Sequence, residues 1–210
     1  MISTREALER LREGNQRFAS GAGCRDETRS IRARRAELLN GQQPFAIVLG
    51  CSDSRVPAEI IFDQGLGDLT VIRVVGNIVT PSQIDSVEFA ATRFSIRLVV
   101  VLGHSRCGAI LATMEECQQP METRSGRLSS IVSHIRPSVE PLLATELRHD
   151  PEALVQRAVR ANIRVSANCL RKGSAVLERL IQRQRLLVVG AEYSLESGLV
   201  DFFDGVPETS

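Results

Sequence analysis

The first hydrophobic pattern along the chain is helical. Over residues 4–19, apolar positions such as Leu8 and Leu11 recur on roughly one face of a helix. Ser3 stands just before this segment and Glu6 follows three residues later, which is the spacing of a capping box. The pattern therefore predicts an amphipathic helix that needs a surface to lie against.

From Pro44 onward the pattern changes to alternating strands and helices. Four continuous apolar runs have the length of strands, and they cover residues 45–50, 69–75, 97–103 and 185–191. Continuous apolar runs indicate strands that are buried on both faces, as in parallel sheets. We therefore expect an α/β fold with a central, mainly parallel, four-stranded sheet flanked by helices.

Helical patterns fill the spaces between these runs. Thr80 and Pro81 look like an N-cap and a first helical position. Pro137 and Pro141 are expected to kink or interrupt one of the later helices. The predicted later helices cover residues 108–117, 127–147 and 151–184.

No repeat or flexible linker divides the 210 residues, and 43% hydrophobic content is ample for one core. We expect a single domain over 1–210, in which 1–40 form an N-terminal helical arm.

Formal net charge is +1, from 26 basic and 25 acidic side chains, so no global field favours nucleic acid or a membrane. A local basic run is predicted to pair with carboxylates, because no aromatic residues interrupt it to stack bases. It contains Arg25, Arg29, Arg32, Arg34 and Arg35.

The five cysteines are an odd number without the dense spacing of a secreted disulfide framework. The amino terminus is charged and has no apolar core segment, and no stretch approaches the roughly 20 apolar residues of a membrane span. These features predict a cytoplasmic protein with no membrane partner. Three of the cysteines, Cys24, Cys117 and Cys169, are expected to be unreactive packing residues.

The other two cysteines and a histidine stand where two predicted strands end. Cys51 directly follows one apolar run, and His104 directly follows another, with Cys107 three residues later. In open α/β sheets ligands gather beyond the carboxyl ends of the strands. Two thiols and an imidazole are donors that Zn²⁺ prefers, and three protein ligands leave a fourth position for water, whose pKa can fall to about 7. The sequence predicts one zinc per chain and attack by zinc-bound hydroxide.

Asp53 and Arg55 lie beside Cys51 and are close enough to form an ion pair. A guanidinium would hold the carboxylate ionised, so that Asp53 could orient the zinc-bound water. Alternatively, Asp53 could leave Arg55, bind zinc itself and close the site. Gly108, after Cys107, would let the backbone come near metal and substrate.

The run CSDSRVP together with HSRCG resembles the β-class carbonic anhydrases, which interconvert carbon dioxide and bicarbonate at zinc. The resemblance extends from about Gln42 through GDLTVIRVVGNIV and SVEFAA to VVGAEYSLESG. It implies that Cys51, His104 and Cys107 bind zinc and that Asp53 and Arg55 form a dyad beside it. It also implies homodimers, often paired into dimers of dimers, whose amino-terminal helices wrap a partner.

The resemblance further implies a substrate pocket. Gln42, Val75 and Phe89 match positions that line the pocket in the plant-type branch, and a small apolar slot suits carbon dioxide. Some members have an inhibitory bicarbonate site with a tryptophan, an arginine and a tyrosine. This chain has no tryptophan, so Arg73 and Tyr193 are predicted to serve a subunit interface instead.

Three other functions stay open from the sequence. A hydrolase of carbonyl sulfide or carbon disulfide would share the same zinc ligands. A regulatory protein could hold a structural zinc that Asp53 closes permanently. A thiol redox protein is the third, although the chain lacks a Cys-x-x-Cys pair.

The two other histidines, His134 and His149, are expected to be exposed rather than part of a proton relay.

Overall fold

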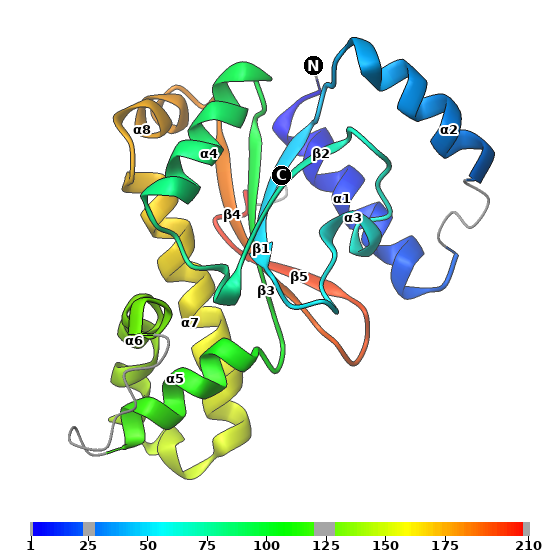
Figure 1. Cartoon of the computed structure of the whole chain (residues 1–210). Coiled ribbons are helices and arrows are strands. Elements are labelled where there is room, and N and C mark those ends of the chain that lie inside the picture. Colours follow the sequence, from blue (N-terminus) through cyan, green and yellow to red (C-terminus); the bar gives the residue numbers. More distant parts are fainter. Residues whose placement is uncertain (1, 23–27, 120–128, 208–210) are drawn as a thin grey trace.

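The computed structural model describes residues 2–22, 28–119 and 129–207, and its centre is a five-stranded sheet (Figure 1). The strand order is β2-β1-β3-β4-β5. Neighbouring strands among the first four are parallel, and β5 is antiparallel to β4. The strands are β1 (Ala46–Cys51), β2 (Leu69–Val74), β3 (Leu98–His104), β4 (Leu187–Tyr193) and β5 (Val200–Asp204).

The expected α/β fold with a mainly parallel sheet is confirmed, but the sheet has one strand more than the predicted four. β5 is a short edge strand that pairs with β4 alone. Its sequence, VDFFD, carries two aspartates, and all five residues keep some exposure to solvent. An edge strand of this kind does not show the continuous apolar run by which the other four were found.

The helices are α1 (Thr4–Ala19), α2 (Thr28–Glu37), α3 (Ala58–Ile61), α4 (Pro81–Arg93), α5 (Gly108–Gln118), α6 (Ser129–Leu143), α7 (Pro151–Lys172) and α8 (Ala175–Gln182). Short 3-10 turns are η1 (Leu38–Asn40), η2 (Val75–Asn77) and η4 (Glu146–His149). The predicted start of α4 is confirmed, because Thr80 caps the helix and Pro81 is its first residue. None of the described helices has the length and apolar character needed to cross a membrane.

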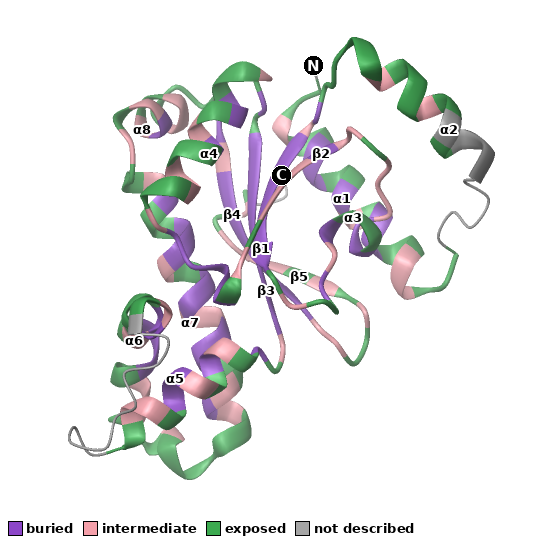
Figure 2. Ribbon diagram, in the orientation of Figure 1, coloured by how far each residue is buried: buried purple, intermediate pink, exposed green. Residues whose placement is uncertain are grey.

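The helices form a layer on each face of the sheet (Figures 1 and 2). Successive side chains of a strand point to opposite faces. Ile47 and Val99 therefore pack with α4, α5, α7 and α8 on one face, whereas Val48 and Val100 pack with α1 and α3 on the other. The central strands β1 and β3 are buried along their whole length. This burial on both faces explains why their sequences are continuously apolar.

Helix α1 begins with the predicted capping box between Ser3 and Glu6. Its apolar residues Ala7, Leu8 and Leu11 are buried against the sheet of their own chain. The surface that the amphipathic pattern required is therefore supplied within the same chain, and the part of the N-terminal arm that stands apart from the sheet is α2 (Figure 1).

Two predictions about later helices are corrected: the two prolines do not interrupt their helix, and the last helical segment is divided in two. Helix α6 continues through Pro137 and Pro141. Both prolines lie on its exposed side, where a carbonyl that loses its helical hydrogen bond can bind water. The predicted helix 151–184 is divided, because α7 ends before Gly173 and the Ser174 side chain accepts hydrogen bonds from the first turn of α8.

Within the described part of the basic run, Arg34 pairs with carboxylates as predicted, whereas Arg35 is exposed and makes no ion pair there. Arg34 lies 3.3 Å from Glu37 and 3.7 Å from Asp68. Side chains of Arg25, Arg29 and Arg32, and all of Cys24, lie outside the described part of the chain. Cys117 is half-buried, but Cys169 is exposed, so the prediction that Cys169 is a packing residue is wrong.

Candidate metal centre

Three buried side chains meet at the carboxyl edge of the sheet. Cys51 is the last residue of β1, His104 is the last residue of β3, and Cys107 is the N-cap of α5. Because β1 and β3 are parallel neighbours, their carboxyl ends lie side by side. The two sulfur atoms and a ring nitrogen all lie within 4.8 Å of one another.

The donor atoms of this cluster fit a zinc ion. His104 has its Nδ1 atom 2.9 Å from the carbonyl oxygen of Ser105, which leaves Nε2 for another partner. This Nε2 atom is buried and makes no hydrogen bond within the described part of the chain. A buried ring nitrogen without a partner is costly in a folded protein unless a ligand satisfies it. Together with two thiols it gives the Cys₂His set of a zinc site with one open position.

The two thiols influence each other strongly. The hydrogen bond from Cys107 is the largest of the interactions that lower the pKa of Cys51 to about 4. Burial acts in the opposite direction, and His104 contributes to the lowering. The same hydrogen bond, together with burial, raises the pKa of Cys107. Burial lowers the pKa of His104, but its electrostatic interaction with the Cys51 thiolate outweighs burial, so the net shift is upward. Zinc binds cysteine as thiolate, so a bound Zn²⁺ would displace the protons that remain on the two sulfurs.

Asp53 and Arg55 form the predicted ion pair next to the cluster. Arg55 donates from Nε to Oδ1 of Asp53 at 3.0 Å and from Nη2 to Oδ2 at 2.7 Å. The backbone N–H of Arg55 adds a third hydrogen bond to Oδ1 at 2.9 Å. The hydrogen bonds from Arg55, opposed by burial, hold the pKa of Asp53 well below its usual range. Asp53 Oδ2 lies 3.9 Å from Nε2 of His104, so a fixed, ionised carboxylate borders the metal cluster.

Arg73, which was predicted to serve a subunit interface, holds the backbone beside the cluster, a role that its sequence context did not predict. It donates from Nε to the carbonyl of Cys51 at 3.2 Å and from Nη2 to the carbonyl of Asp53 at 2.6 Å. Arg73 therefore fixes the end of β1, which carries Cys51, and the segment just after it, which carries Asp53. Tyr193 is only 6% exposed and packs against Phe18 in its own chain, and its role in a subunit interface stays a prediction.

The predicted substrate residues do not all gather at the cluster. Gln42 and Phe89 line one hollow along β2, and none of Cys51, Asp53, His104 and Cys107 lines it. Val75 is 39% exposed and precedes Gly76, which contacts Cys51. Gly108 begins α5, but a Cβ atom there would meet nothing within 4 Å, so packing in this chain does not require glycine.

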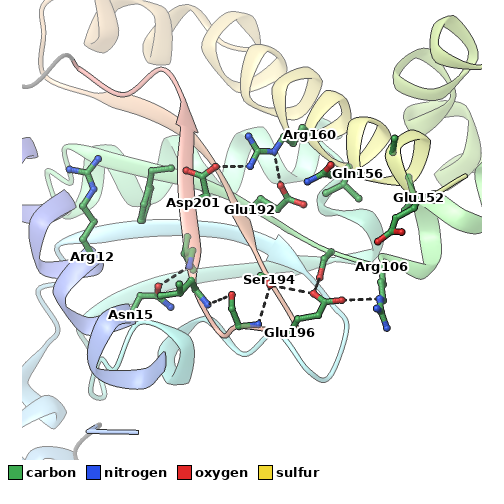
Figure 3. A pocket seen from close by; sticks show the side chains of 18 of the residues that line it. Arg12, Asn15, Arg106, Glu152, Gln156, Arg160, Glu192, Ser194, Glu196 and Asp201 are labelled. Carbon is green, nitrogen blue, oxygen red and sulfur yellow. Dashed lines mark hydrogen bonds and ion pairs between the residues drawn. The ribbon is translucent and has the colours of Figure 1, made fainter. Parts of the chain in front are cut away.

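A large polar hollow lies beside the β4–β5 hairpin, apart from the zinc donor atoms (Figure 3). Its charged groups are largely paired with one another. Arg160 contacts Glu192 at 2.7 Å and Asp201 at 2.6 Å, and Arg106 contacts Glu196 at 2.9 Å. These ion pairs join α7 and the loop after β3 to the hairpin. The charged groups of this hollow therefore serve to hold the structure together.

Two buried thiols, an unpartnered imidazole nitrogen and an adjacent carboxylate define a zinc centre with an open position, on an α/β sheet. Comparison with known proteins agrees with this class. The family model described as carbonic anhydrase matches residues 46–200. "Carbonic anhydrase 2" of Mycobacterium tuberculosis is 36% identical over 195 residues, covering 91% of this chain and 89% of the relative.

Solved structures give the same result. The β-carbonic anhydrase CcaA has a TM-score of 0.75 at 28% identity, covering 94% of this chain and 95% of that chain. A tetrameric β-carbonic anhydrase of Sordaria macrospora has the same fold, with a TM-score of 0.72 at 22% identity and coverage of 94% and 97%. This chain therefore belongs to the β-class carbonic anhydrases, a family of zinc lyases.

Proposed function

We propose that this protein is a zinc enzyme that catalyses the reversible hydration of carbon dioxide to bicarbonate and a proton. The observation that carries the proposal is the Cys51, His104 and Cys107 cluster, with its unpartnered Nε2 atom, beside a carboxylate that Arg55 fixes. The same cluster could serve a structural zinc. An ionised carboxylate 3.9 Å from His104 Nε2, beside the cluster, favours catalysis instead.

Each residue has a stated role in this proposal. Cys51, His104 and Cys107 hold the metal. Zinc, when bound, lowers the pKa of water so that hydroxide is available near neutral pH. Asp53 would accept a hydrogen bond from a water bound there and orient it, while Arg55 keeps the carboxylate ionised and directed. If Asp53 left Arg55 and bound the metal, it would close the site.

We propose that substrate is bound by residues from two copies of the chain. Val75 and Gly108 flank the cluster in their own chain. Gln42, which precedes β1, and Phe89, which is 62% exposed on α4, line the hollow along β2, and β2 has no outer neighbour among the described strands. In a homodimer joined along this edge, they could complete the apolar slot of the partner's metal centre. The Sordaria relative is described as tetrameric, which supports further pairing of dimers.

The remaining proposals concern the location of the protein in the cell, the class of its substrate and the route of the product proton. The odd number of cysteines supports a cytoplasmic location, where thiols stay reduced. The near-neutral net charge supports small-molecule substrates rather than nucleic acid. His134 and His149 are both exposed, which supports transfer of the product proton to buffer rather than through a buried relay.

The decisive experiment is stopped-flow carbon dioxide hydration across pH, on protein of measured zinc content. We expect activity in proportion to zinc. Hydrolysis of carbonyl sulfide and carbon disulfide is measured on the same samples, and faster turnover of either would favour the sulfur substrates. One zinc per chain without hydration, even at alkaline pH, would indicate a structural metal and contradict the proposal.

A further inference from the structure

The sulfur atom of Cys51 accepts a hydrogen bond from outside the metal cluster. Its donor is the backbone N–H of Gly76, with a distance of 3.4 Å between nitrogen and sulfur. Gly76 lies in the turn η2 at φ 66° and ψ 21°, in the left-handed region that favours glycine. A Cβ atom there would lie 2.8 Å from Cδ1 of Ile135 and 3.1 Å from Cβ of Ala109. The donor therefore depends on a backbone conformation that other residues would strain.

The other side of Gly76 is held by Asn162 of α7. The Nδ2 atom of Asn162 donates to the carbonyl oxygen of Gly76 at 2.8 Å. Asn162 is only 2% exposed, and its Oδ1 atom has no partner among the described residues. A buried amide with an unsatisfied oxygen weakens the fold relative to an apolar side chain of the same shape. The hydrogen bond to Gly76 is therefore the contact that accounts for an asparagine at this position.

We propose that Asn162 is a positioning residue for the zinc centre and acts on Cys51 through Gly76. The N–H and carbonyl of Gly76 belong to the peptide groups on either side of its Cα atom. Holding the carbonyl restricts rotation about that atom and keeps the N–H directed at the sulfur. A hydrogen bond to a metal-bound thiolate draws electron density from sulfur and so tunes the metal. The inference rests on the zinc site of the proposed function.

The test replaces Asn162 by leucine, which has nearly the same size and no donor. Ser166→Ala is the matched control, because Ser166 is 3% exposed and lies one turn further along the same helix. The readouts are the thiolate-to-cobalt absorption band of the cobalt(II)-loaded protein and zinc affinity by chelator competition. We expect Asn162→Leu to shift the band and weaken zinc binding about tenfold, with both readouts unchanged in Ser166→Ala.

An unchanged band and zinc affinity in Asn162→Leu would overturn the inference. Asn162→Ser, which is polar but shorter, is made in parallel as a second variant. Failure of both variants to fold, with Ser166→Ala folded, would assign Asn162 to the stability of the fold and overturn the inference equally. A wild-type protein that binds neither zinc nor cobalt would instead contradict the proposed function itself, so the two failures are distinguishable.

Discussion

The metal cluster and the hollow along β2 differ in how completely one chain builds them. The cluster draws on two adjacent strand ends and a helix start, and its three side chains are at most 4% exposed. The hollow contains Gln42 and Phe89 but no zinc donor, and it lies along β2, which has no outer neighbour among the strands that the structure describes. One chain brings the three zinc donors together, and under the proposed function a second copy completes the substrate slot.

Replacing a ligand of the cluster should have the largest effect. Cys107→Ser removes one of two thiolates, so we expect zinc content near zero and hydration at background, measured by elemental analysis and stopped flow. Cys169→Ser is the matched control, because this cysteine is exposed and outside the cluster. Normal zinc content in Cys107→Ser would exclude Cys107 as a ligand.

Replacing the carboxylate beside the cluster should separate binding from chemistry. We expect Asp53→Ala to keep its zinc and to hydrate carbon dioxide about a hundredfold more slowly, because the hydrogen bond that orients water is lost. Zinc content and hydration rate are measured on the same preparation. Full activity would remove Asp53 from the mechanism, and loss of zinc would make it a necessary ligand.

Mixing two variants tests whether Gln42 of one chain completes the active site of the other chain in a dimer. Gln42→Ala should lower activity about tenfold, the value of one hydrogen bond. When Gln42→Ala and Cys107→Ser chains are unfolded and refolded together, heterodimers should contain one intact site, so activity should exceed the sum of the separate samples. The control mixes Asp53→Ala with Cys107→Ser, whose changed residues belong to the same site in each chain. No gain in the first mixture would place Gln42 in the site of its own chain.

The smallest expected effect concerns the pH dependence of stability. Because Arg55 lowers the folded-state pKa of Asp53, the ion pair stabilises the protein above the ordinary aspartate pKa of about 4, and the contribution is lost as pH falls through the lower folded value. In metal-free protein, Arg55→Ala should therefore lower Tm by at most about 3 °C at neutral pH. This gap should narrow below about pH 4, as followed by circular dichroism; a gap that widens in acid would contradict the assignment.

The sequence was most informative where burial is uniform. Strands β1 and β3 are buried on both faces, so their apolar runs located them to within one residue and placed Cys51 and His104 at the same edge. Strand β5 was missed because an exposed edge strand carries polar residues. The break between α7 and α8 had a readable signal, since Gly173 and Ser174 are a typical helix end followed by a cap.

The residue types and their order along the chain determined the zinc donors, the Asp53 and Arg55 pair, and the parallel sheet, because each depends on local pattern and on strand ends that meet by topology. Contacts across the fold were decided only by tertiary structure. Arg73 reaches back to the loop of Cys51, and Asn162 reaches Gly76 from 86 residues further along the chain. No local pattern encodes such pairs, because packing of the helices on the sheet brings them together.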